Sequence, residues 1–181
     1  MVRRHASSPG GEKLQGALDR FDVDPTGVVA LDAGISTGGF TDCLLQAGAA
    51  RVIGIDVGYG QLAERLRRDA RVELHERTNV RTLTVADLDT GPVDLLVADL
   101  SFISLTTVLP VLVPLLRPDG TAVLLVKPQF EVGRARVGRG GIVREPEAWQ
   151  DALVGVGTTL ERLDRPIADV IPSPIRGTEG N

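Results

Sequence analysis

The 181-residue chain is poor in cysteine, histidine, lysine and aromatic residues, and these shortages exclude several classes of protein. With a single cysteine, Cys43, the chain cannot form an internal disulfide, and we expect a reducing, cytoplasmic location. Cys43 falls within an apolar helical pattern, which predicts a small core residue. Because the two histidines are far apart and no cysteine cluster lies near them, no metal site is predicted.

Long apolar segments are also missing. The longest apolar run, residues 109–116, is interrupted by Pro110 and Pro114, so no segment is predicted to span a bilayer. The opening residues M-V-R-R-H-A-S-S-P-G-G lack the apolar stretch of a secretory signal. A hydrophobic fraction of 43% and a net charge of −4 are typical of a soluble globular protein. The length predicts one domain with its own core.

The basic residues are unusual in kind, with eighteen arginines and only two lysines, Lys13 and Lys127. A buried lysine can lose its proton, whereas arginine effectively cannot, so both lysines are candidates for chemistry. The alternative is that they are ordinary surface residues. The net acidity argues mildly against a strong nucleic-acid footprint, although a local arginine cluster at 134–144 keeps that function open.

Apolar runs alternate with helical periodicities along the chain. The predicted strands are 28–31, 51–55, 72–75, 93–98, 121–126 and 167–171. The predicted helices are 11–21, 40–47, 61–68, 105–116 and 146–163, with a glycine- and arginine-rich loop at 131–144. This alternation predicts the α/β class: a Rossmann-like, doubly wound, mostly parallel sheet with helices on both faces.

The segment from Val28 to Phe40, V-V-A-L-D-A-G-I-S-T-G-G-F, reads as a buried strand, a glycine turn and a helix start. The next strand ends in Asp56, which completes half of a nucleoside-binding βαβ unit. Asp32 precedes the turn, where it would repel a pyrophosphate but attract the ammonium and sulfonium of S-adenosylmethionine. We therefore predict an S-adenosylmethionine site with Asp56 on the ribose hydroxyls. The alternatives are a turn that merely allows close packing and a dinucleotide-dependent oxidoreductase.

Four charged residues, Asp32, Asp56, Asp99 and Lys127, stand where predicted strands end, which indicates one shared site. A cysteine nucleophile for methylation of a pyrimidine carbon is excluded, because Cys43 lies on the helix beneath the cofactor loop. The turn D-L-S-F that starts at Asp99 lacks the prolines typical of amino-directed base methyltransferases. A hydroxyl target fits better, with Lys127 to polarise or deprotonate it and Asp99 to orient the lysine.

Six sequence blocks follow one another in a specific order. They are G-G-E-K-L (10–14), L-D-A-G-I-S-T-G-G-F-T-D (31–42), D-V-G-Y-G-Q-L (56–62), E-R-T-N-V-R (76–81), V-A-D-L-S-F-I-S-L (97–105) and L-V-K-P-Q-F-E-V-G (125–133). In these blocks the chain resembles the haemolysin A (TlyA) type of ribosomal RNA methyltransferase, within the FtsJ-like group of ribose 2′-O-methyltransferases. The resemblance implies the fold of a class I S-adenosylmethionine-dependent methyltransferase. It also implies ribosomal RNA or a ribosomal subunit as partner, with no membrane and no metal.

The resemblance also implies residue roles. Of a Lys-Asp-Lys-Glu tetrad, Lys13, Asp99 and Lys127 would fill the first three places, and Lys127 would act on the ribose hydroxyl. The implied cofactor contacts are Asp32, Gly34, Ser36, Gly38, Gly39, Phe40, Asp56, Val57, Asn79 and Asp99. In the loop at 131–144 we expect phosphate contacts from Arg134, Arg136 and Arg139. The alternative for that loop is a flexible, solvated segment.

The ends of the chain depart from the family pattern. In the family the tetrad glutamate follows a Gly-Asn pair in the last strand, and this sequence stops at Gly180-Asn181. We expect residues 11–181 to form a methyltransferase domain without its last strand, and residues 1–10 to be a residual linker. The chain as written is therefore expected to be weak or inactive. Two competing functions are a catalytically inactive S-adenosylmethionine-binding module and a membrane-active haemolysin, for which the sequence offers no basic amphipathic helix.

Overall fold

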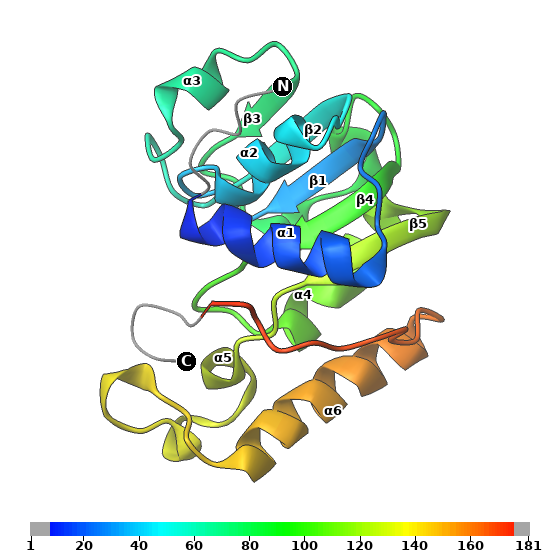
Figure 1. The fold of residues 1–181 in the computed structure, drawn as a ribbon. Coiled ribbons are helices and arrows are strands. Elements are labelled where there is room, and N and C mark those ends of the chain that lie inside the picture. The colour runs from blue at the N-terminus through cyan, green and yellow to red at the C-terminus, as the bar shows by residue number, and fades with distance from the viewer. Residues whose placement is uncertain (1–7, 176–181) are drawn as a thin grey trace.

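A computed structural model of the chain describes residues 8–175; residues 1–7 and 176–181 fall outside that description, and with them Gly180 and Asn181. Within residues 8–175 there are five strands, β1 (Val29–Ala33), β2 (Arg51–Ile55), β3 (Val72–His75), β4 (Val93–Ala98) and β5 (Leu116–Leu124). They form one parallel sheet in the order β3-β2-β1-β4-β5 (Figure 1). The chain proceeds outward in one direction from β1 and in the other from β4, which confirms the predicted doubly wound α/β fold.

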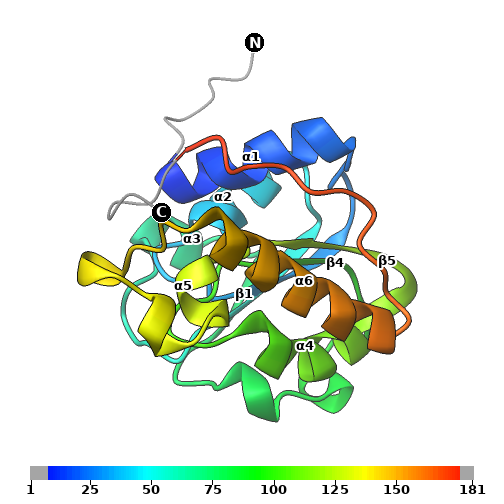
Figure 2. The same cartoon turned by 90° about the horizontal axis from the view of Figure 1, so that it is seen from below.

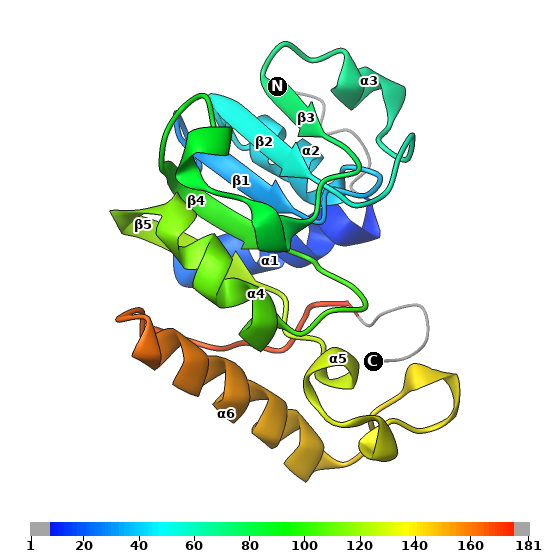
Figure 3. The same cartoon turned by 180° about the vertical axis from the view of Figure 1, so that it is seen from behind.

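The helices cover both faces of the sheet, as predicted. α1 (Pro9–Phe21) and α2 (Gly39–Gln46) lie on one face, and α4 (Leu105–Leu112) lies on the other (Figures 1 and 3). α6 (Pro146–Arg162) packs on α4 along the β5 side of the sheet, while the single-turn helices α3 (Glu64–Arg67) and α5 (Pro128–Glu131) follow β2 and β5. The remaining 3₁₀ turns are η1 (Val80–Thr82), η2 (Val85–Asp87), η3 (Val113–Leu115), η4 (Arg134–Arg136) and η5 (Arg139–Gly141).

Alternating side chains of the central strands divide the core into two clusters. Successive residues of a strand point to opposite faces, so a strand buried on both sides reads as a continuous apolar run. The cluster under α1 and α2 contains Ala30, Val52 and Leu95. The cluster under α4 and α6 contains their immediate neighbours, Leu31, Ile53 and Leu96. Burial on both faces explains why these strands were predictable from composition alone.

The predicted strand at 167–171 is wrong. These residues form no strand; they run as extended, mostly exposed chain between α1 and α6 (Figure 2). A groove of about 1310 Å³ lies between this segment and β5. Extended chain becomes a strand only when its backbone groups pair with a neighbour, and β5 pairs only with β4 among the described residues. Pro174 instead packs on α1, where a Cβ added at Gly16 would come within 2.8 Å of its side chain.

Several boundaries also differ from the predictions. β5 begins at Leu116 rather than residue 121, because its first residues pair irregularly with β4 between Val93 and Leu95. Arg165 supports this irregular start by donating to the carbonyl oxygens of Arg117 (2.7 Å) and Pro118 (2.6 Å). The predicted helix 105–116 ends at residue 112 and continues as η3, the predicted helix 61–68 shortens to α3, and η4 and η5 lie within the predicted loop 131–144. No helix within residues 8–175 is long and apolar enough to cross a membrane.

Candidate active site

The residues predicted to share one site follow or end the central strands. Asp32 lies in β1, Asp56 directly follows β2, Asp99 directly follows β4, and Lys127 lies three residues beyond β5. The Asp99 backbone N–H donates to the carbonyl of Ala33 (3.2 Å), which holds the ends of β4 and β1 together. Because all strands are parallel, these ends form the same edge of the sheet, at the point where the strand order reverses.

Lys127 and Asp99 form an ion pair at this edge. The Lys127 Nζ lies 2.5 Å from Asp99 Oδ1 and 2.8 Å from Ser101 Oγ. The side chains of Lys127 and Asp99 are 19% and 22% exposed, so water screens the pair only in part. The last bond that fastens this segment to the sheet is from Leu125 N–H to the Ala98 carbonyl (2.9 Å). The amine is thus held by a carboxylate and a hydroxyl yet remains reachable from solvent.

Asp32 is a buried acid with a free oxygen. Its Oδ2 accepts a hydrogen bond from Thr41 Oγ1 at 2.7 Å, whereas Oδ1 has no partner among the described residues. Burial raises the pKa of Asp32 to about 7, and the nearby charge of Asp99 acts in the same direction against the Thr41 hydrogen bond. Buried polar atoms without partners are rare and costly, so this oxygen favours a cationic or hydrogen-bonding ligand.

The glycines in the turn between β1 and α2 meet two requirements, an unusual backbone conformation and close packing. Gly34 has φ +90°, and a Cβ there would come within 2.8 Å of the Asp99 carbonyl oxygen, so no side chain fits between β1 and β4. Gly38 and Gly39 are closely packed as well. A Cβ at Gly38 would meet the side chain of Leu66, and one at Gly39 would lie 2.8 Å from Ser8 Oγ at the start of α1. Packing therefore requires glycine at these two positions, and their contact with a cofactor stays a prediction.

Asp56 connects the loops that follow β1 and β2. Its Oδ2 accepts from the backbone N–H of Ser36 (2.8 Å) and its Oδ1 from that of Gly58 (2.7 Å). Each carboxylate oxygen has a further lone pair, so the group can still accept bonds from hydroxyls. Val57, beside it, is 69% exposed, and Asn79 begins η1 with its side-chain oxygen accepting from Arg81 N–H at 3.0 Å.

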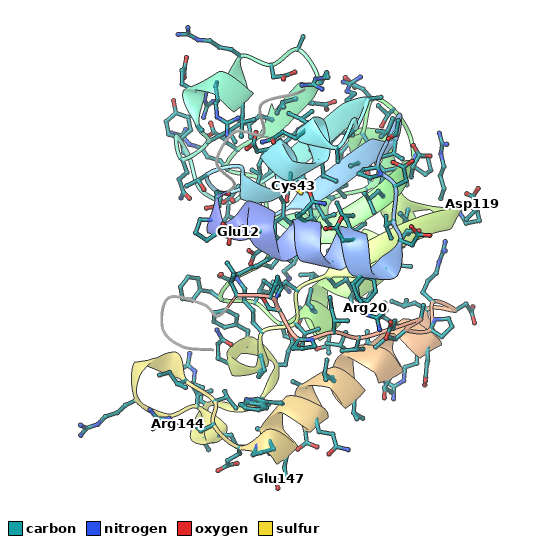
Figure 4. All side chains as sticks on the ribbon, viewed as in Figure 1. Glu12, Arg20, Cys43, Asp119, Arg144 and Glu147 are labelled. Atoms are coloured by element: carbon teal, nitrogen blue, oxygen red, sulfur yellow. The ribbon has the colours of Figure 1, made fainter. Side chains whose placement is uncertain are left out.

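Two predicted site residues lie apart from the ion pair. Phe40 is 6% exposed and belongs to the core cluster under α1, so packing accounts for its position. Lys13 is half-buried on α1, and the ion pair of Asp99 is with Lys127 and not with Lys13. It borders the groove that Val126 and Pro128, the neighbours of Lys127, also line. Its neighbour Glu12 marks the end of α1 that faces the carboxyl ends of the strands (Figure 4).

The structure separates the three arginines expected to bind RNA. Arg134 and Arg139 are exposed. The guanidinium of Arg136 is held by α6, with NH1 at 2.5 Å from Asp151 Oδ2, and its Nε lies 3.6 Å from Glu145 Oε2. Arg136 thus fastens the loop to the helix, and Arg144 marks where that loop reaches α6 (Figure 4).

An aromatic pair beside Lys127, formed by exposed Phe102 and half-buried Phe130, escaped the sequence analysis. Phe102 is 92% exposed with φ +65°, and its ring centroid lies 5.4 Å from that of Phe130. The Lys127 Nζ lies 6.0 Å from the Phe130 centroid. An exposed phenylalanine in left-handed backbone is unusual and points to a functional role. The signal was present in D-L-S-F and K-P-Q-F, where each phenylalanine follows the charged residue by three positions.

Metal and cysteine chemistry have no support in the described residues. Within residues 8–175, no group of three or more histidine, cysteine, aspartate or glutamate side chains is placed to hold a metal ion. Cys43 is buried beneath α1 (Figure 4), which confirms the prediction of a core residue. Burial, with smaller contributions from Asp42 and Asp19, raises its pKa to about 12, so the thiol stays protonated at neutral pH.

Comparisons with known proteins agree with one another. The profile of the FtsJ-like methyltransferases matches residues 7–181. The 16S/23S rRNA (cytidine-2'-O)-methyltransferase TlyA of Mycobacterium tuberculosis is 51% identical over 174 residues, which are 96% of this chain and 65% of that protein. Hemolysin A of Brachyspira hyodysenteriae is 37% identical over 179 residues, covering 96% and 72% of the two chains. The crystal structure of a Lactococcus lactis protein, a hemolysin by name, has a TM-score of 0.94 and 42% identity over 99% of this chain and 86% of that one. The chain thus spans just under two thirds of the length of the mycobacterial relative.

Proposed function

The chain belongs to the FtsJ-like methyltransferase family, and on that premise we propose that it transfers a methyl group from S-adenosylmethionine to a ribose 2′-hydroxyl of ribosomal RNA. The observation that carries the proposal is the ion pair of Lys127 and Asp99 at the strand ends, which presents an amine to an incoming hydroxyl. The name of the mycobacterial relative describes the same reaction, which supports this choice of substrate.

The residues at the strand ends fit the proposed cofactor. The unpartnered Oδ1 of Asp32 suits an ammonium, and the remaining lone pairs of Asp56 suit ribose hydroxyls. Gly34 leaves the space between them free of a side chain. Val57 and Asn79, which follow on the same edge, would border the nucleoside. When bound, S-adenosylmethionine supplies the methyl group on a positively charged sulfur.

Lys127 would act on the substrate hydroxyl. A ribose hydroxyl is a weak nucleophile. The charged Lys127 would polarise it, and once the ammonium has given a proton to solvent, the neutral amine could accept the hydroxyl proton as the methyl group is transferred. Asp99 and Ser101 hold that amine at 2.5 Å and 2.8 Å, which fixes its direction. Lys13, at the margin of the same groove, would supply a second positive charge near the RNA backbone.

The RNA would be held by stacking and by phosphate contacts. Phe102, which packs on Phe130 beside Lys127, offers an exposed ring on which an unpaired base can stack. We assign the phosphate contacts to Arg134 and Arg139, which are exposed, and the placement of their loop to Arg136. The partner would be ribosomal RNA or a ribosomal subunit in the cytoplasm.

The test is incorporation of labelled methyl groups into ribosomal subunits. Lys127→Arg keeps the charge but cannot accept a proton at neutral pH, and we expect transfer to fall at least about 100-fold. The affinity for S-adenosylhomocysteine, measured by calorimetry, should stay within about twofold. Arg162→Lys, an exchange between the same residue types at an exposed position of α6, is the matched control.

The assay uses both this chain and a version extended to the length of its relatives, because the chain spans 65% of the mycobacterial protein. We expect the extended version to be the more active of the two. Near-normal transfer by Lys127→Arg would show that the lysine is only an electrostatic anchor. Absence of transfer in both wild-type versions, with S-adenosylhomocysteine still bound, would favour the cofactor-binding module instead.

A further inference from the structure

Glu131 joins the two chain segments that carry Lys127 and Asp99. Its Oε2 accepts from Ser104 Oγ (2.5 Å) and its Oε1 from the backbone N–H of Leu105 (2.7 Å). Ser104 is the N-cap of α4 and accepts in turn from the N–H of Thr106 (3.1 Å). A carboxylate at a helix N-terminus also interacts favourably with the helix dipole. The last residue of α5 is therefore fastened to the first turn of α4.

Beyond the sheet, the segment that carries Lys127 is supported by this attachment to α4 and by the packing of α5 on α6. The ladder between β4 and β5 ends before Lys127, with the bond from Leu125 N–H to the Ala98 carbonyl. The following helix, α5, has only four residues and cannot be stable by itself. The Phe130 N–H donates to the Lys127 carbonyl at 2.9 Å, so a shift of α5 moves the lysine backbone with it.

We propose that Glu131 is a positioning residue for the transfer reaction: it clamps α5 to α4 so that Lys127 stays on Asp99 and Phe130 stays on Phe102. Two short segments, 99–104 and 127–131, are thus joined at both ends, by the ion pair at one end and by the bond from Ser104 to Glu131 at the other. The aromatic pair lies between these two connections. Glu131 does not reach the substrate itself. The importance of the clamp for catalysis rests on the proposed function, whereas its effect on Lys127 does not.

Glu131→Gln tests the clamp while preserving side-chain length. One of its two terminal oxygens becomes an amide nitrogen and the negative charge is lost, so only one terminal atom can still accept and neither bond is charge-assisted. The first readout is the reactivity of Lys127 toward trace acetylation, measured by mass spectrometry relative to Lys13. Because these are the only two lysines in the sequence, Lys13 serves as the internal reference. We expect the ratio of Lys127 to Lys13 labelling to rise at least about threefold when Lys127 leaves Asp99.

Two control variants separate this effect from a general loosening of the fold. Thr106→Val removes a hydroxyl that lies 2.6 Å from Ser104 Oγ but leaves both bonds to Glu131. Glu147→Gln makes the same chemical change at an exposed position of α6. Both should leave the labelling ratio unchanged. An unchanged ratio in a folded Glu131→Gln protein overturns the proposal, whatever its activity.

The second readout is methyl transfer. In Glu131→Gln we expect the turnover number to fall about tenfold, with the affinity for S-adenosylhomocysteine unchanged. A merely structural role would instead weaken cofactor binding together with turnover. If the labelling ratio rises but wild-type protein transfers no methyl group, the proposed function fails and the clamp on Lys127 stands. If the ratio rises and turnover in an active protein is unaffected, the positioning role in catalysis is overturned.

Discussion

At the scale of single residues, Asp32 is the clearest candidate for a pH-dependent group. Its pKa is raised to about 7, chiefly by burial, so the carboxyl is largely protonated in the free protein below neutral pH. A ligand ammonium favours the ionised form. We therefore predict that the affinity for S-adenosylhomocysteine rises about tenfold between about pH 6 and pH 8. Calorimetric titration across this range measures it, and in Asp32→Asn the affinity should be weak and independent of pH.

The same residue makes the unliganded protein less stable as the pH rises. An unfolded aspartate titrates near 3.8, whereas folded Asp32 titrates near 7. Between these values the folded state binds a proton that the unfolded state has lost, so the contribution of Asp32 is complete below the lower value. It is lost as the pH rises through the upper one. Burial of the Asp32 carboxylate thus has two effects. It lowers the stability of the free protein at neutral pH and above, and it favours the binding of a ligand ammonium.

Phe102 is expected to matter for methyl transfer but little for the stability of the fold. Phe102→Gly removes about 1–2 kcal/mol of strain from a residue at φ +65°. It also loses the ring contact with Phe130, about 0.5–1.5 kcal/mol. The melting temperature should therefore change by no more than about 6 °C. Methyl transfer should fall about 5- to 150-fold, the equivalent of about 1–3 kcal/mol of lost base stacking. Normal transfer by a folded Phe102→Gly protein would exclude the stacking surface.

At the scale of elements, the arginines in the loop between α5 and α6 are expected to have different roles. Arg134→Ala removes an exposed charge and should reduce the salt dependence of RNA binding by the equivalent of about one phosphate contact. Arg136→Ala instead releases the loop from Asp151 and Glu145. It should weaken binding while leaving the salt slope nearly unchanged. Filter binding at several salt concentrations distinguishes the two variants, and equal losses of slope would show that both arginines contact phosphate.

At the scale of the whole molecule, the cofactor should stabilise the entire domain, because its proposed contacts come from β1, β2 and β4 together. A ligand that binds only the folded state at 100 times its dissociation constant adds about 2.7 kcal/mol. For a domain of this size we predict that S-adenosylhomocysteine raises the melting temperature by about 5–11 °C. Thermal denaturation measures this, with NAD at the same concentration as the control. A larger shift with NAD would contradict the assignment of the cofactor.

The sequence by itself determined the fold class, most of the strands and the charged residues that end them. Strands buried on both faces, such as the one that contains Leu31, must be continuously apolar, so local composition identifies them. Because parallel strands share one carboxyl edge, the sequence alone predicts that Asp32, Asp56, Asp99 and Lys127 lie at one edge of the sheet. These inferences succeed because each depends on backbone preferences and periodicities that span only a few residues.

Only the tertiary structure decided which groups touch. Lys127 pairs with Asp99 while Lys13 does not, Arg136 is held by α6, and within the described part of the chain residues 167–171 pair with no strand. None of this is encoded in a short stretch of sequence, because a partner is chosen by the distance between segments remote along the chain. Glu131 illustrates the point: its hydrogen bonds reach back 26 and 27 residues to α4. Local physics fixes the elements, and packing them together fixes the contacts on which the chemistry depends.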